Sequence, residues 1–308
     1  MALRVAVPDL VSPSYFPAIA AVELGFFKRE GLDATIELLF PVTSTYEALR
    51  DGRLDFVAGA AHAPLYAFRN WEGCKLLAAL AQHMYWFLVL RKDLGAKRGD
   101  LSAVKGLRIG AAPGPVDGLK RMLVEAGMDP GRDVQIGPVP GTAGAGVSFG
   151  VAAAKALEEG KLDGFWANGM GAEVAVRNGT GTLVLDARRG DGPPAARDYT
   201  FPALVTTQKK INEQPDQVAA AVRALVAAQQ SLKEDPARAT AVGRKLFPEA
   251  EAELIAELIR RDAPFYDPAI APGSVVALNA FGRDMGILSG TVTYDDVVAP
   301  RFRPLWKA

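Results

Sequence analysis

At the start of the chain, segments with the hydrophobic pattern of a strand and segments with the pattern of a helix follow one another. Residues 3–7 and 54–58 form short apolar runs typical of buried strands, and residues 32–39 alternate as in a half-exposed strand. Residues 18–28 carry apolar side chains at helical spacing, and a second helix is predicted in the stretch before residue 54. This strand–helix order predicts a mostly parallel β-sheet with helices on its faces.

The second predicted helix carries signals at both ends. It opens at Thr43–Glu47, where Ser44 and Glu47 have the spacing of a capping box, in which each side chain satisfies a backbone N–H group of the first turn. Gly52 stands where a helix end favours a left-handed residue. We therefore expect a helix that begins near Ser44 and stops at Gly52.

The same order of elements starts again near residue 107. Strands and helices are predicted there at residues 107–111, 116–126, 134–136, 151–159, 162–167 and 183–185, after strands within residues 76–90. Residues 188–198 are rich in Gly, Pro and charge, which is typical of a linker or flexible loop. Helices that we expect to pack on the first sheet follow at residues 216–233, 236–246, 250–261 and 273–285.

An eight-residue segment occurs twice in the chain. Ala48–Asp55 and Ala156–Asp163 share Ala-Leu at their start, a central Gly followed by a basic residue, and Leu-Asp at their end. Leu3–Val7 returns as Leu107–Ala111 at nearly the same separation. The repeat predicts two lobes of the same build, with a ligand-binding cleft between them. We place the first lobe at residues 1–90 with 203–308 and the second at 91–202, joined by a hinge of two chain crossings.

The composition is that of an ordinary globular protein. Hydrophobic residues make up 49% and charged residues 23%, with a formal net charge of +0, so no nucleic-acid partner is expected. No apolar run has the roughly 20 residues of a membrane helix. The chain shows no signal peptide, which leaves a cytosolic protein and a mature exported domain both open.

Motifs of cofactor and catalytic chemistry are missing from the sequence. Cys74 is the only cysteine and His62 and His83 are the only histidines, so neither an internal disulfide nor a multi-histidine metal site is expected. The glycine-rich segment Gly141–Gly150 lacks the glycine spacing and the lysine of nucleotide-binding loops. We therefore expect no cofactor and assign no catalytic residue.

Ligands of open parallel sheets gather at the carboxyl ends of the strands. This rule nominates hydroxyl, small and aromatic side chains, which suit a small organic ligand with a few polar groups. In the first lobe the nominated residues are Ser14, Tyr15, Phe16, Thr43, Ser44, Thr45, Ala61, His62, His83 and Trp86. In the second they are Gly114, Val116, Asp117, Ser148, Trp166 and Asn168. No Arg or Lys falls clearly among these positions, so a bound anion would rely on backbone donors at helix N-termini.

Each nomination has a structural alternative. His62 and His83 could be buried histidines with satisfied ring nitrogens, and Trp86 and Trp166 could be core residues. Tyr15 and Phe16 could fix their loop without touching a ligand.

The segment Pro17–Leu32 resembles the signature of a known family. It contains Gly25-Phe26-Phe27 and, three residues later, Glu30-Gly31-Leu32, as in substrate-binding proteins for nitrate, taurine, sulfonates and thiamine-pyrimidine precursors. The two octets and Gly106–Gly110 also follow the order of that family. The resemblance implies the α/β type II periplasmic-binding-protein-like fold, with two lobes and a two-stranded hinge that closes on a solute. It also implies a pocket lined by Ser14–Phe16, Thr43–Thr45, Ala60–His62 and Gly114–Asp117.

The resemblance further implies a transport function. The protein would be a periplasmic or lipid-anchored monomer without catalytic activity that delivers a carboxylate, sulfonate, aromatic or heterocyclic compound to an ABC permease and its ATPase. It would meet the membrane only through the permease. The basic residue that some sulfonate binders place in the cleft is not evident here.

Two other functions remain open. The same fold serves cytosolic enzymes, of the decarboxylase, dehydratase or pyrimidine-precursor synthase type, although the single Cys74 cannot form the cysteine-rich motif of that synthase. A cytosolic ligand sensor is the third possibility.

Overall fold

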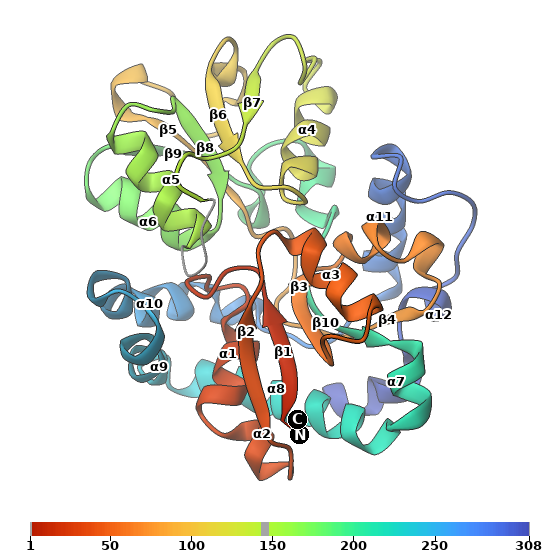
Figure 1. Cartoon of the computed structure of the whole chain (residues 1–308). Coiled ribbons are helices and arrows are strands. Elements are labelled where there is room, and N and C mark those ends of the chain that lie inside the picture. The colour runs from red at the N-terminus through yellow and green to blue at the C-terminus, as the bar shows by residue number, and fades with distance from the viewer. Residues whose placement is uncertain (1, 143–147, 308) are drawn as a thin grey trace. The chain divides into compact units, whose positions relative to one another are not determined.

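The computed structural model describes residues 2–142 and 148–307 of the chain (Figure 1). The chain forms two compact units, Met1–Gln82 with Thr200–Ala308, and His83–Tyr199. We call them the first and the second unit. The expectation of two α/β units is confirmed.

The first unit contains a five-stranded sheet in the order β2-β1-β3-β10-β4. Its strands are β1 (Leu3–Val7), β2 (Ala34–Leu38), β3 (Phe56–Ala60), β4 (Cys74–Ala79) and β10 (Pro202–Thr207). The strand β1 pairs parallel with β2 and β3, whereas β10 runs antiparallel to both β3 and β4. The sheet is therefore mostly parallel, with one reversed strand.

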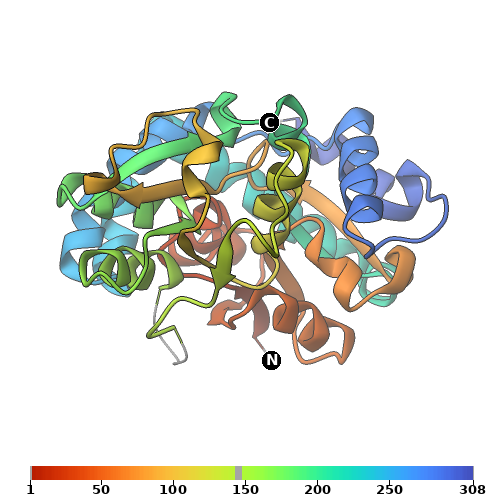
Figure 2. The same ribbon diagram turned by 90° about the horizontal axis from the view of Figure 1, so that it is seen from above.

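The helices of the first unit come from both ends of the chain. They are α1 (Phe16–Glu23), α2 (Phe26–Arg29), α3 (Val42–Arg50), α7 (Gln208–Glu213), α8 (Pro215–Glu234), α9 (Arg238–Leu246), α10 (Glu249–Asp262), α11 (Pro272–Asp284) and α12 (Tyr294–Val297). Helix α3 packs on β1, β3 and β10, and α8 packs on α1 and α2. The late helices α11 and α12, blue in both views, lie together (Figures 1 and 2). The expected packing of the C-terminal helices with the first unit is thus observed.

The second unit repeats this topology with other strands. Its sheet has the order β7-β6-β8-β5-β9, built from β5 (Phe87–Arg91), β6 (Arg108–Ala111), β7 (Gln135–Gly137), β8 (Gly164–Ala167) and β9 (Gly181–Asp186). Here β5 is the reversed strand, antiparallel to β8 and β9. The helices are α4 (Val116–Glu125), α5 (Phe149–Glu158) and α6 (Gly169–Arg177). The repeated sequence therefore corresponds to a repeated sheet.

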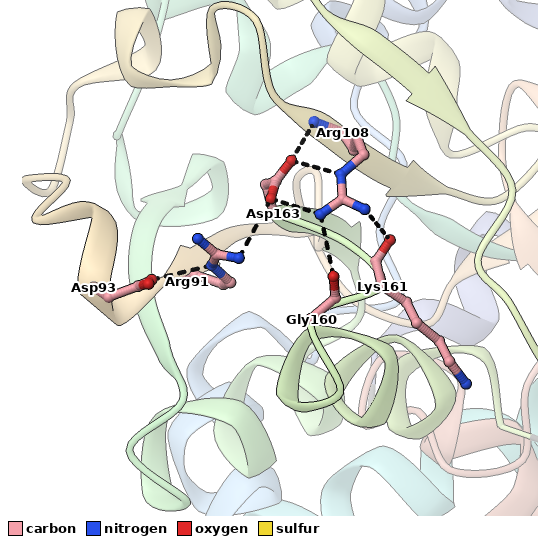
Figure 3. Close-up of polar contacts among 6 residues, drawn as sticks. All are labelled: Arg91, Asp93, Arg108, Gly160, Lys161 and Asp163. Carbon is pink, nitrogen blue, oxygen red and sulfur yellow. Dashed lines mark hydrogen bonds and ion pairs between the residues drawn. The ribbon is translucent and has the colours of Figure 1, made fainter.

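The last residue of each octet joins two elements of its unit. In the second unit, Asp163 accepts the backbone N–H of Arg108 at 3.0 Å and two bonds from its guanidinium at 2.9 Å (Figure 3). The same guanidinium donates to the carbonyls of Gly160 and Lys161, just after α5. These bonds satisfy two carbonyl groups in the turn that links α5 to β8. The octet is scaffold, at the start of the strand.

Several expectations about local structure are corrected. The helix expected at residues 18–28 is split into α1 and α2, because Gly25 adopts a left-handed φ of 75°. Helix α3 begins at Val42, earlier than expected, so Ser44 lies inside the first turn and no side chain caps the helix. Gly52 follows the end of the helix with a φ of 72°, as predicted.

Two further differences concern the segments that connect the units. Strand β5 pairs within the second unit, so residues 83–90 belong there and not with the first lobe as expected. Residues 188–198 contain two short 3₁₀ turns, Ala187–Arg189 and Pro194–Asp198, and include side chains that are fully buried. The segment predicted as a linker or flexible loop thus contains short helical turns and buried side chains.

Candidate functional site

The parallel strands of each sheet end at one edge, which we call the carboxyl edge. In the first unit β1, β2, β3 and β4 end there, and in the second unit β6, β7, β8 and β9. The reversed strands β5 and β10 begin at the same edges, at Phe87 and Pro202. Because loops and helix N-termini converge at such edges, each is the part of its unit best suited to hold a ligand.

The loop after β1 is buried along most of its length. Ser12, Ser14 and Tyr15 are at most 4% exposed, and α1 follows with Phe16, which is also buried. The carboxylate of Asp9 accepts the N–H of Val11 at 2.8 Å. The nominated Ser14, Tyr15 and Phe16 thus lie together in one fixed loop at the carboxyl edge.

The nominated residues of α3 differ in how they are used. Thr43 and Ser44 are half-buried in the first turn. The hydroxyl of Thr45 is buried and donates to the carbonyl of Val42 at 2.6 Å. This bond within the helix occupies the Thr45 donor, so Thr43 and Ser44 are the hydroxyls of this helix that remain better placed for a ligand.

His62 follows β3 and is fully buried. Its Nδ1 lies 3.0 Å from the hydroxyl of Thr200, and its ring meets Phe281 edge-on at 5.3 Å between centroids. Its neighbour Ala61 is buried and donates its N–H to Phe201 at 2.8 Å. The ring is therefore held by neighbours within the first unit, as expected for a structural histidine.

Aromatic side chains of the second unit form a buried cluster around β5 and β8. Trp86 and Trp166 lie 6.3 Å apart, and Tyr85 lies 4.6 Å from Trp86. Trp166 is fully buried, and its Nε1 donates to the carbonyl of Pro115 at 2.9 Å. This bond fixes the turn that leads into α4. The packing role is thus well supported, whereas contact of these rings with a ligand remains a prediction.

The helix N-termini of the second unit carry the other nominated residues. Asn168 caps α6, because its side-chain oxygen accepts the N–H groups of Met170 and Gly171 at 3.0 and 3.3 Å. Ser148 stands before α5 without a side-chain cap bond. Gly114 has a φ of 89° in the turn before α4, whose first residues are Val116 and the buried Asp117. Part of the segment Gly141–Gly150 lies outside the described residues.

His83, at the start of the second unit, contacts two residues near the end of that unit. Its Nδ1 is 2.7 Å from the carboxylate of Asp198, and its Nε2 is 2.8 Å from the guanidinium of Arg197. Because an arginine can only donate, Nε2 accepts and Nδ1 carries the proton. Burial lowers the pKa of His83, against the opposing hydrogen bond to Asp198. The imidazole is accordingly neutral at physiological pH.

Arg188 is a buried basic residue that the sequence analysis did not find. It is 1% exposed, lies two residues after the end of β9, and its guanidinium carbon lies 6.0 Å from the centre of the Tyr85 ring. Arg188 is not among the nominated positions, and it adds a buried basic residue at the carboxyl edge of the second unit. The strand rule applied to β9 would have found it, but residues 188–198 were interpreted as a linker.

Other parts of the described structure offer little for cofactor chemistry. Among residues 2–142 and 148–307, no cluster of three or more His, Cys, Asp or Glu side chains is arranged to hold a metal ion. A cavity of about 640 Å³ in the first unit is lined by Asp55, Lys210 and other residues at the opposite edge of the sheet, away from the nominated side chains. No helix in the described ranges combines the length and apolar character needed to cross a membrane.

Solved structures with the same fold include both binding proteins and an enzyme. The periplasmic nitrate-binding protein NrtA from Synechocystis PCC 6803 is 16% identical with a TM-score of 0.75, over 99% of this chain and 87% of the other. The alkanesulfonate-binding protein SsuA from Xanthomonas axonopodis pv. citri is 15% identical with a TM-score of 0.73, over 97% and 96%. The desulfurization enzyme DSZB is 16% identical with a TM-score of 0.64, over 98% of each chain. The fold alone therefore does not separate binding from catalysis.

Sequence comparison gives a family. No curated protein sequence matches the chain significantly. The family model described as NMT1/THI5 like matches residues 12–239, which include the Gly25-Phe26-Phe27 signature and both octets. The chain belongs to the NMT1/THI5-like family.

Proposed function

We propose that this protein is the solute-binding component of an ABC importer. Its ligand is a small organic compound that carries a carboxylate, a sulfonate or a heterocycle. The observation that carries the proposal is the repeated sheet, in which each unit presents a carboxyl edge with buried hydroxyl or aromatic side chains. Support also comes from the family and from the shared fold with proteins named for sulfonate and nitrate binding.

An enzyme is the second candidate, and the His83–Asp198 pair is the observation that raises it. A histidine with a carboxylate on Nδ1 has the arrangement of an acid–base pair. In this protein, however, Arg197 donates to Nε2, the nitrogen that would take a proton from a substrate. The pair therefore supports a structural role, in which it joins the beginning of the second unit to its end. This role favours binding over catalysis.

The proposal is tested with purified protein and a panel of small carboxylates, sulfonates and heterocycles. A bound compound raises the thermal midpoint by mass action, and calorimetry then gives its affinity. Mass spectrometry after prolonged incubation is expected to recover that compound unchanged. Turnover at enzyme-like rates would instead establish the catalytic alternative.

Cellular location and assembly state complete the proposal. We propose that the protein works outside the cytoplasm, next to the permease, as a monomer that closes on its ligand. The relatives named as periplasmic support this location. Cell fractionation and light scattering on the native gene product check both points, and a cytoplasmic product fused to a signalling module would favour a sensor.

A further inference from the structure

The loop between β1 and α1 holds two buried hydroxyl groups without partners. Ser12 is 0% exposed and Ser14 is 1% exposed. Among the residues that the structure describes, neither Oγ atom has a hydrogen-bond partner. Buried polar side chains almost always have one, and a hydroxyl left without one destabilises the folded state. Two such groups in one short loop therefore call for an explanation.

Two hydrogen bonds hold the backbone of this loop in place. Tyr266 is fully buried and donates its hydroxyl to the carbonyl of Pro13, between the two serines, at 2.8 Å. Asp9 binds the N–H of Val11 at the start of the loop. Loops normally run over the protein surface, whereas this loop is buried and its backbone is hydrogen-bonded at Val11 and at Pro13.

The position of the loop indicates what kind of group the serines would meet. They lie at the carboxyl edge of the first unit, directly before α1, whose N-cap residue Tyr15 makes no side-chain cap bond. The N-terminal end of a helix carries a partial positive charge that favours an anion. Hydroxyl donors beside such an end suit an acceptor oxygen that carries negative charge.

We propose that the hydroxyls of Ser12 and Ser14 donate hydrogen bonds to the oxyanion of the ligand, which is a singly charged carboxylate or sulfonate. A carboxylate or a sulfonate supplies such an acceptor oxygen with a single negative charge. The proposal rests on the solute-binding function and specifies the chemical group that the first unit recognises.

The test compares serine variants in free and ligand-bound protein. Calorimetry of the wild type with benzoate, benzenesulfonate and the neutral benzamide is expected to show binding of an oxyanion but not of the amide. Ser12→Ala and Ser14→Ala should each weaken that binding by about 10- to 100-fold, as for hydrogen bonds to charged groups. The thermal midpoint of the free variants should stay the same or rise, because no bond within the protein is lost.

Thr206→Val provides the matched control. The Thr206 hydroxyl is also buried, but it donates to the carbonyl of Asp55 at 2.7 Å, at the opposite edge of the same sheet. This variant should lower the thermal midpoint and leave oxyanion affinity unchanged. The serine and threonine variants thus have opposite signatures in stability and binding.

Two results would overturn the inference. One is a serine variant that loses stability but binds the oxyanion as the wild type does, which would assign the hydroxyls to internal packing with bound water. The other is a wild type that binds none of the oxyanions. If the wild type then binds a neutral solute from the broader panel, the transport function stands and the oxyanion inference alone fails.

Discussion

The two units use the same backbone bond at the start of their sheets but different cations around it. Asp55 accepts the N–H of Arg4 at 2.8 Å, as Asp163 accepts that of Arg108. In the first unit the Asp55 carboxylate then pairs with Lys210 at 2.7 Å, and the guanidinium of Arg4 lies 3.9 Å from Glu37.

In the second unit Asp163 pairs with the guanidinium of Arg108 and, at 3.6 Å, with that of Arg91. Two features are thus common to both units: the bond to the backbone N–H and a cation from chain outside the octet. Lys210 follows the reversed strand β10, and Arg91 ends the reversed strand β5. The comparison shows that both copies of the repeat keep the bond between the aspartate and the backbone N–H. The cation that pairs with the aspartate, in contrast, comes from a different position in each unit.

The largest expected effect comes from a position where the two units carry side chains of very different size. By the spacing of the octets, Trp166 on β8 corresponds to Ala58 on β3. Trp166→Ala gives the second unit the residue of the first, and it should lower the free energy of unfolding by about 3–5 kcal/mol, since it empties a fully buried site. Denaturant unfolding measures the loss, with Tyr66→Ala at an exposed site as the control. Unchanged stability with a large loss of ligand affinity would instead show that the ring serves the ligand.

A smaller effect is expected from neutralising the two equivalent aspartates. Asp163→Asn keeps an acceptor for the Arg108 N–H but loses the charge of a half-buried carboxylate whose arginine partners are partly exposed to solvent, at a cost of about 1 kcal/mol. Asp55→Asn loses a single pair with Lys210 and should cost less. Urea unfolding of both variants decides the order. Equal losses would mean that the backbone bond, not the cation, determines the contribution.

Acid titration tests the same carboxylate without a change of backbone contacts. The hydrogen bond from Arg108 lowers the pKa of Asp163 from 3.8 to about 2. A lowered pKa stabilises the folded state above the unfolded value, and this contribution disappears as the pH falls through about 2. The difference in unfolding free energy between wild type and Asp163→Asn should therefore be constant above about pH 5 and shrink toward pH 2. A difference that does not change with pH would rule out the charge as its origin.

The smallest effects are expected from the arginines themselves. Arg108→Lys removes the two-pronged bond to Asp163 and the donors to Gly160 and Lys161, so it should destabilise the protein measurably. Arg4→Lys removes a 3.5 Å contact to the carbonyl of Gly52 and a 3.9 Å pair with Glu37, both long, and should leave the thermal midpoint nearly unchanged. Parallel thermal unfolding compares the two. A larger loss for Arg4→Lys would reverse the contrast between the units.

Local signals in the sequence were sufficient to predict most of the fold. A helix that stops at Gly52 and a strand that follows Asp55 are specified by neighbouring residues, and the second octet repeats both. Strand β10 was not predicted, because its partners β3 and β4 lie far back in the chain and its six residues follow a segment rich in Pro and Gly. Pairing between distant segments leaves no periodic signal in a short strand.

The candidate site was predictable only to the level of loops. The strand rule correctly placed Ser14 and His62 in loops at the carboxyl edge, but it did not predict that Thr45 donates to Val42 or that Asn168 caps α6. Such bonds depend on where a helix begins, which the pattern gives only to within a few residues. Arg188 was missed for a related reason, since its burial beside Tyr85 depends on a strand about a hundred residues earlier.

The reversed strand β10 has a consequence for the order in which the chain folds during synthesis. The second unit is continuous, from His83 to Tyr199, and all strands of its sheet have been made before Thr200 is added. The sheet of the first unit is completed later, because β10 lies between β3 and β4. The position of β10 stays empty until residues 202–207 leave the ribosome. The N-terminal segment, although synthesised first, therefore completes its sheet last, and until then its unpaired strand edges are the part of the nascent chain most exposed to aggregation.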